Sequence, residues 1–127
     1  MKALYTVFSI FKKLQFIALT GYATVLSLIP DPGDDFNSIW DKYLHLACWM
    51  VLGLSLWLAL PAGKRIFAPA AWLFAYSVLI EILQHILPER QFSLLDIVAN
   101  ALGIGCAIAA VTVYEQWLLP MLWPKKS

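Results

Sequence analysis

Long apolar stretches separated by short polar connectors make up most of this chain. Four such stretches can be read, at residues 14–29, 40–60, 67–87 and 94–119. An α-helix rises about 1.5 Å per residue and the hydrocarbon core of a bilayer is about 30 Å thick, so each stretch is about long enough to cross a membrane. The pattern therefore predicts an all-α polytopic membrane protein with four transmembrane helices in one bundle.

The first apolar stretch ends at a helix-stop and turn sequence that runs from Pro30 to Gly33. No small-x-small cleavage site follows the stretch, so we interpret it as a retained helix and not as a secretory signal. Residues 1–13 precede it, and a helix there would place Leu4, Val7, Phe8 and Phe11 on one side. We expect them to form either an extra cytoplasmic turn or a short helix in the membrane plane.

Basic residues are concentrated on one side of the predicted spans. Seven of the nine Lys and Arg residues lie before the first span, between the second and third, or after the fourth: Lys2, Lys12, Lys13, Lys64, Arg65, Lys125 and Lys126. The positive-inside rule places these segments, and with them both termini, in the cytoplasm. Lys42 and Arg90 remain on the outer side together with most of the acidic residues.

Composition agrees with a membrane protein and argues against other classes. The 127 residues are 61% hydrophobic and 13% charged, and their mean hydropathy is +0.74, which lies outside the range of soluble globular proteins. A chain of this length has room for one bundle, so residues 1–127 are predicted to form a single domain. Because the net charge is only +1 and the basic residues are dispersed, a nucleic-acid partner is not expected.

Three short polar motifs interrupt the apolar pattern near the predicted outer side. They are Asp41-Lys42-x-x-His45, Glu81-x-x-Gln84 followed by Arg90, and Asp96-x-x-x-Asn100. Spacings of three and four residues place the members of each helical motif on one face. Glu81 and Asn100 would each lie about 10 Å below the outer boundary. The short connector at residues 88–92 makes the third and fourth helices antiparallel neighbours, so the motifs predict one pocket that opens outward.

The charged residues of these motifs also have purely structural explanations. Asp41 and Asp96 follow Ser38 and Ser93 by three residues, which matches the capping box and would direct both acids to backbone N–H groups. Lys42 could extend to the lipid headgroups. Each of these residues therefore has a structural role to be weighed against a functional one.

Glu81, the two amides and the small residues of the fourth span also have purely structural explanations. A carboxylate such as Glu81 is costly inside a membrane and is expected to face the bundle. Together with Gln84 and Asn100 it could hold helices together by hydrogen bonds. Two rows of small residues in the fourth span favour close helix packing: Ala99-xxx-Gly103-xxx-Ala107 and Gly105-xxx-Ala109.

Taken together, the three polar motifs resemble the signature of the VanZ-like family of small bacterial membrane proteins. The resemblance covers about residues 41–105. It implies a multi-pass integral protein of the bacterial cytoplasmic, or inner, membrane with a role at the cell envelope. The founding member is associated with low-level teicoplanin resistance, so the resemblance also implies a possible effect on antibiotic resistance.

The motif residues are compatible with two kinds of function. In the first, the pocket binds or acts on a lipid-linked phosphate or cell-wall precursor among the membrane lipids. The candidate catalytic residues are Asp41, His45, Glu81 and Asp96, and the candidate ligand-binding residues are Lys42, Gln84, Arg90 and Asn100. Arg90 and Lys42 would hold anionic oxygens. His45, oriented by Asp41, would act as a general base and Glu81 as an acid.

The second kind of function needs no turnover, because the polar layer would be a structural or antibiotic-shielding element. It needs no Ser or Cys nucleophile, and Ser93, three residues before Asp96, is better explained as a helix cap. A divalent metal is a further alternative, with these candidate ligands: Asp41, His45, Glu81, His85 and Asp96. No recognised metal-ligand spacing supports it, so we assign no metal and leave the cofactor open.

Overall fold

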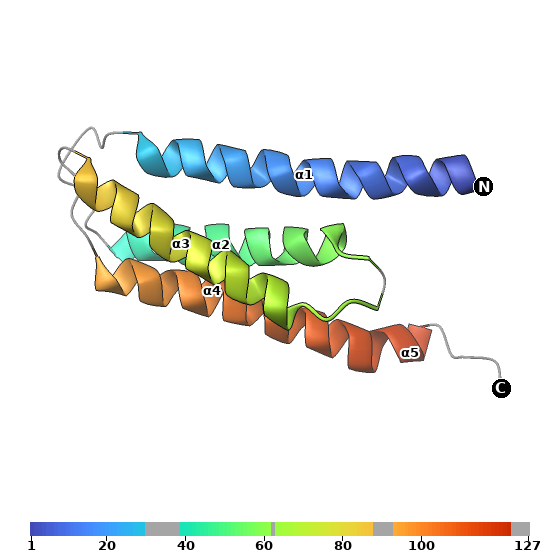
Figure 1. Ribbon diagram of the computed structural model, residues 1–127. Helices are drawn as coiled ribbons and strands as arrows, with labels where there is room; N and C mark the ends of the chain where they lie inside the picture. The colour runs from blue at the N-terminus through green and yellow to red at the C-terminus, as the bar shows by residue number, and fades with distance from the viewer. Residues whose placement is uncertain (30–38, 62, 88–92, 123–127) are drawn as a thin grey trace.

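The computed structural model describes residues 1–29, 39–61, 63–87 and 93–122. Within these segments all regular structure is helical. The helices are α1 (Lys2–Leu28), α2 (Ile39–Ala59), α3 (Phe67–Ile86) and α4 (Leu94–Val113), followed by a π-helical turn η2 (Tyr114–Leu118) and a short α5 (Leu119–Leu122) (Figure 1).

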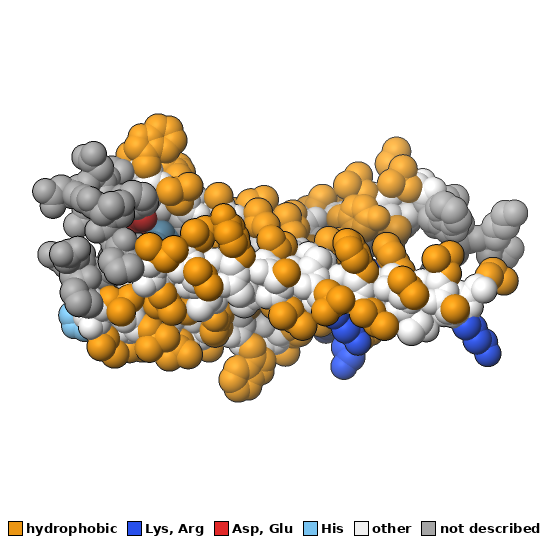
Figure 2. Space-filling model, turned by 90° about the horizontal axis from the view of Figure 1, so that it is seen from above, with side chains coloured by type: hydrophobic (Ala, Val, Ile, Leu, Met, Phe, Trp, Pro, Cys, Tyr) orange, Lys and Arg blue, Asp and Glu red, His pale blue; other side chains and the backbone are white. Residues whose placement is uncertain are grey.

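Four helical segments are long and apolar enough to cross a bilayer: α1, α2, α3, and α4 continued through η2 and α5. The predicted all-α architecture with four membrane-spanning helices is therefore confirmed. Figure 2 shows hydrophobic side chains along nearly the whole described length of one face. Lys and Arg side chains appear on this face only in the half away from the visible acid and histidine side chains.

Residues 1–13 do not form a separate helix in the membrane plane, so that alternative is wrong, and they instead add turns to the start of the first helix. Helix α1 runs without interruption over 27 residues because neither Gly nor Pro occurs before Leu14. Gln15 Nε2 donates to the carbonyl oxygen of Ser55 at 3.0 Å, and Ser55 Oγ donates to Gln15 Oε1 at 2.8 Å. Lys12 and Lys13, about one turn earlier, therefore lie level with the end of α2, and the first residues of α1 extend beyond it.

Helices α2 and α4 make the most extensive contact in the bundle. A Cβ atom at Gly103 would overlap the carbonyl oxygen of Leu46 and would lie 3.0 Å from the backbone nitrogen of Met50. A Cβ atom at Gly53 on α2 would lie 2.6 Å from the Cβ of Ala107. The two backbones approach closely because these positions lack side-chain bulk.

Only one of the two predicted small-residue rows serves this contact. Ala99, Gly103 and Ala107 are buried, whereas Gly105 and Ala109 are exposed. No atom lies within 4 Å of a Cβ built at Gly105. A step of two residues turns the helix by about 200°, so both rows cannot face α2.

The fourth span does not continue to its end as a regular α-helix. Pro120 has no N–H, and its ring clashes with the carbonyl group four residues earlier, that of Gln116. The wider turn η2 contains Gln116 and accommodates this conflict. Trp57 Nε1 of α2 donates to Glu115 Oε1 at 2.7 Å, which ties η2 to the bundle.

Helix α1 lies along one side of the bundle and contributes no buried residue. The apolar core consists of α2, α3 and α4 residues with Ile66 of the connector: Trp49, Leu52, Leu56, Ile66, Ala70, Leu73, Ile104 and Val111. Polar contacts hold α1 against this core. Besides the Gln15–Ser55 pair, Thr24 Oγ1 and Tyr76 Oη share a hydrogen bond of 2.6 Å.

The start of α1 and the end of α5 lie at the same end of the bundle (Figure 1). Their cytoplasmic location remains a prediction from the basic residues. In a Cys48→Ala/Cys106→Ala background, Gly33→Cys in the α1–α2 connector, which lies outside the described residues, should react with an impermeant thiol reagent on intact cells. Ala3→Cys should react only after permeabilisation. The reverse labelling pattern would place the start of α2 on the cytoplasmic side.

Candidate functional site

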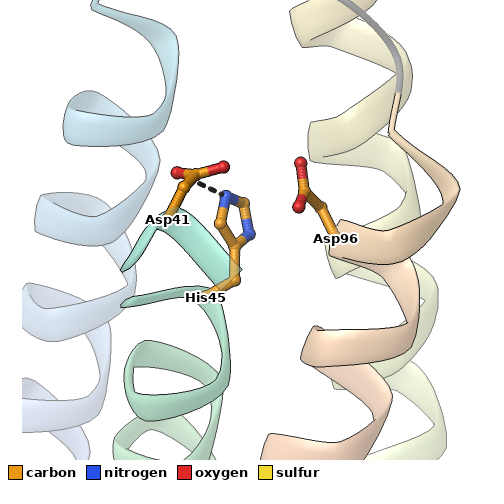
Figure 3. A group of neighbouring side chains, drawn as sticks. All are labelled: Asp41, His45 and Asp96. Carbon is orange, nitrogen blue, oxygen red and sulfur yellow. Dashed lines mark ion pairs between the residues drawn. The ribbon is translucent and has the colours of Figure 1, made fainter. Parts of the chain in front are cut away.

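Six polar side chains from three helices meet near the end of the bundle where α2 and α4 begin. They form the polar cluster, which consists of Asp41, Lys42 and His45 on α2, Glu81 on α3, and Asp96 and Asn100 on α4. Glu81, Asp96 and Asn100 are buried, while the three α2 side chains are half-buried. Figure 3 shows Asp41 and His45 of α2 opposite Asp96 of α4.

Lys42 connects α2 to α4. Its Nζ lies 3.2 Å from Asp41 Oδ2 and also forms an ion pair with Asp96 Oδ1. The Lys42 side chain is only 22% exposed, so it turns inward instead of extending to the lipid headgroups. An ammonium between two carboxylates neutralises part of their charge in a region where an unpaired acid would be costly.

His45 is oriented chiefly by Asn100. The His45 Nδ1 lies 3.0 Å from Asn100 Oδ1, and Asn100 Nδ2 donates to Glu81 Oε1 at 3.5 Å. With the amide nitrogen directed to Glu81, Asn100 offers its oxygen to His45, so Nδ1 is the donor. His45 Nε2 lies 3.7 Å from Asp41 Oδ1, which is longer than a hydrogen bond.

The predicted role of Asp41 in orienting His45 is therefore taken by Asn100. The spacing of four residues does place Asp41 and His45 on one face of α2, as Figure 3 shows. However, Lys42 lies closer to the Asp41 carboxylate, at 3.2 Å, and competes for it. Asn100 lies 55 residues away in the chain, so sequence spacing could not reveal its contact with His45.

A role in capping the start of α4 does not explain where the carboxylate of Asp96 lies. The backbone nitrogen of Asp96 donates to Ser93 Oγ at 3.3 Å, which confirms Ser93 as the N-cap of α4. The carboxylate of Asp96 is instead paired with Lys42. For Asp41 the corresponding cap residue, Ser38, lies outside the described residues.

Among the described residues, one predicted ligand-binding residue makes a contact outside the polar cluster. Gln84 is buried, and its Nε2 donates to the carbonyl oxygen of Ser27 at 2.8 Å. Its amide nitrogen therefore helps to fix α3 to α1. Arg90 lies outside the described residues. His85, one of the alternative metal ligands, is exposed at the end of α3.

Three of the alternative metal ligands do lie close together. Asp41, His45 and Asp96 offer ligand atoms within 4.8 Å of one another. The Lys42 ammonium already contacts both carboxylates, and an ion at this position would have to displace it. We therefore assign the two carboxylates to Lys42 and not to a metal.

The formal charges of the polar cluster restrict what it can bind. Three carboxylates face one ammonium, and His45 adds a positive charge only when protonated. With neutral His45 and all three acids ionised, the cluster carries two excess negative charges. An anionic ligand would therefore need a second cation, even if Lys42 exchanged one of its carboxylate partners for the ligand.

Comparison with known proteins gives one match. A model of the family described as VanZ/LLP1 matches residues 3–115, a range that contains the whole polar cluster and Arg90. No curated protein and no solved structure matches the chain.

Proposed function

Because this chain belongs to the VanZ/LLP1 family, we propose that it is a multi-pass protein of the bacterial cytoplasmic membrane that binds or acts on a lipid-linked phosphate or another envelope component at its polar cluster. One observation carries the proposal. Lys42 and His45 lie on one face of α2, half-buried, in front of the buried Glu81 and Asn100. This arrangement offers a cation and an imidazole to a ligand that enters from the membrane surface.

The contacts of His45 support a role in proton transfer. Its Nδ1 is engaged by Asn100, while Nε2 faces Asp41 across 3.7 Å. Because Asn100 fixes the ring and the tautomer, Nε2 is the nitrogen that can accept a proton. Glu81 behind the ring would stabilise the imidazolium that results, since its Oε1 lies 3.5 Å from Nδ1.

Binding of a phosphate also requires more positive charge than Lys42 alone supplies. Lys42 would exchange one carboxylate partner for a phosphate oxygen, and Arg90 is the candidate for the second cation. Arg90 follows the end of α3 by four residues, so it belongs to the connector between α3 and α4. A guanidinium would contact two phosphate oxygens at once.

Replacement of Arg90 by Lys tests this proposal. Arg90→Lys keeps the charge but loses the two-point contact, so the affinity for a polyprenyl phosphate should fall roughly tenfold while the melting temperature stays unchanged. Binding is measured with purified protein in nanodiscs, and the dephosphorylated polyprenol serves as the ligand control. Lys13→Arg, a change on α1 far from the cluster, should leave the affinity unaltered.

The phenotype of the same variant gives an independent result. If cells that express the unaltered protein are less susceptible to teicoplanin, cells that express Arg90→Lys should regain normal susceptibility. Full polyprenyl-phosphate affinity together with full phenotype in Arg90→Lys would contradict a phosphate contact at Arg90.

A non-catalytic structural or antibiotic-shielding role is the second candidate. It is favoured by the ion pairs of Lys42, which join α2 to α4, and by the use of Gln84 to hold α1. In this case the protein would change the outward-facing surface of the cytoplasmic membrane without converting a substrate. Release of phosphate from a polyprenyl phosphate, absent in His45→Gln, would favour the first candidate over this one.

A further inference from the structure

A cleft lies between α1, α2 and α3, on the half of the bundle away from the polar cluster. Its volume is about 770 Å³, within the range of roughly 300–1,000 Å³ typical of small-molecule sites. Apolar side chains from all three helices line it, among them Phe16, Leu56 and Leu73. Lys64 and Arg65, from the connector between α2 and α3, line its end.

The charge that the lining residues place at this end of the cleft is positive. No acidic residue is among those that line the cleft. Lys64 and Arg65 are both exposed, and among the described parts of the chain neither forms an ion pair. An anionic group at the membrane surface would therefore be attracted to these two side chains.

The cleft is also elongated along the helices. A second hollow of about 500 Å³ shares Phe16, Thr20 and Tyr76 with it and continues along α1 to Val25. From Ala68 to Tyr76, the residues of α3 that line the cleft rise by about 12 Å, which is close to half of the ~30 Å hydrocarbon core. The depth of the cleft thus corresponds to the acyl chain of a single leaflet.

We propose that this cleft binds a phospholipid with an anionic headgroup. One acyl chain lies between α1 and α3 against Phe16 and Tyr76, and the phosphate is held by Lys64 and Arg65. The arginine provides two parallel N–H donors for phosphate oxygens and the lysine a second positive charge. This site is separate from the polar cluster, and it does not depend on the function proposed there.

The test is lipid binding to the full-length protein in detergent, followed by native mass spectrometry. Phosphatidylglycerol and phosphatidylcholine with the same acyl chains are compared. We expect phosphatidylglycerol to bind about tenfold or more tightly, and Lys64→Gln/Arg65→Gln to abolish this preference. Lys2→Gln/Lys13→Gln removes the same charge from α1 and should keep the preference.

A second variant tests the acyl-chain part of the cleft. Ala68 lines the cleft and is exposed, so Ala68→Trp should fill the space and reduce binding of both lipids without lowering the melting temperature. Unchanged lipid binding in Ala68→Trp, or an unchanged preference in Lys64→Gln/Arg65→Gln, would overturn the assignment. Displacement of phosphatidylglycerol by an equal concentration of oleate would also overturn it, because the occupant would then be a fatty acid.

Discussion

Gly103→Leu is expected to separate α2 from α4 and to prevent or severely weaken folding of the bundle. Even the Cβ of alanine at this position would overlap the carbonyl oxygen of Leu46, which is backbone and cannot rotate away. Inserting bulk into a well-packed contact typically costs about 1–3 kcal/mol, so Gly103→Ala should already lose this amount and Gly103→Leu more. The free energy of unfolding in mixed micelles measures the loss.

Gly105 offers a matched control on the same helix, two residues away. It is exposed and has no atom within 4 Å of a built Cβ. Gly105→Ala should therefore leave the free energy of unfolding unchanged or raise it by up to about 1 kcal/mol through helix propensity. Equal losses in Gly103→Ala and Gly105→Ala would show that backbone freedom, and not the contact with Leu46, determines the effect.

Lys42→Met should also lower the free energy of unfolding strongly. It leaves the carboxylates of Asp41 and Asp96 without their shared ammonium, and Asp96 is buried. Removing one partner of a buried ion pair typically costs about 3–5 kcal/mol because the remaining charge is uncompensated. We expect Lys42→Met to lose about 3 kcal/mol of unfolding free energy, since its side chain is still 22% exposed.

A double variant separates this explanation from a simple loss of side-chain packing. Lys42→Met/Asp96→Leu removes the uncompensated carboxylate as well and should recover most of the stability. Lys13→Met, at an exposed position on α1, should change the stability by no more than about 0.5 kcal/mol. A double variant as unstable as Lys42→Met alone would mean that the Asp96 charge is not the cause.

Much of the candidate site could be predicted from local spacing. Asp41 and His45 share a helix face at a spacing of four residues, and Ser93 caps α4 three residues before Asp96. The cost of a carboxylate in lipid predicts that Glu81 faces the bundle, and its side chain is buried, with Glu81 only 1% exposed. These inferences needed only the pitch of a helix and the polarity of the membrane.

Other parts of the site could not be predicted, because they depend on which residue is nearest across a helix interface. Gln84 shares its face with Glu81, yet its amide nitrogen donates to Ser27 of α1. The Gln15–Ser55 pair also joins α1 to the bundle. An isolated polar residue in an apolar stretch indicates that its side chain contacts another polar group. The sequence does not show which group that is.

The sequence by itself determined four membrane-spanning helices and the depth at which acids, amides and histidine gather, because helix pitch and the cost of polar groups in lipid act on every residue locally. The tertiary structure decided how these side chains pair. It brought Asn100, and not Asp41, against His45, and it directed Lys42 to Asp96. The physical reason is the close approach of α2 and α4 at Gly103, which sets the rotation of both helices and hence which side chains come within hydrogen-bonding distance.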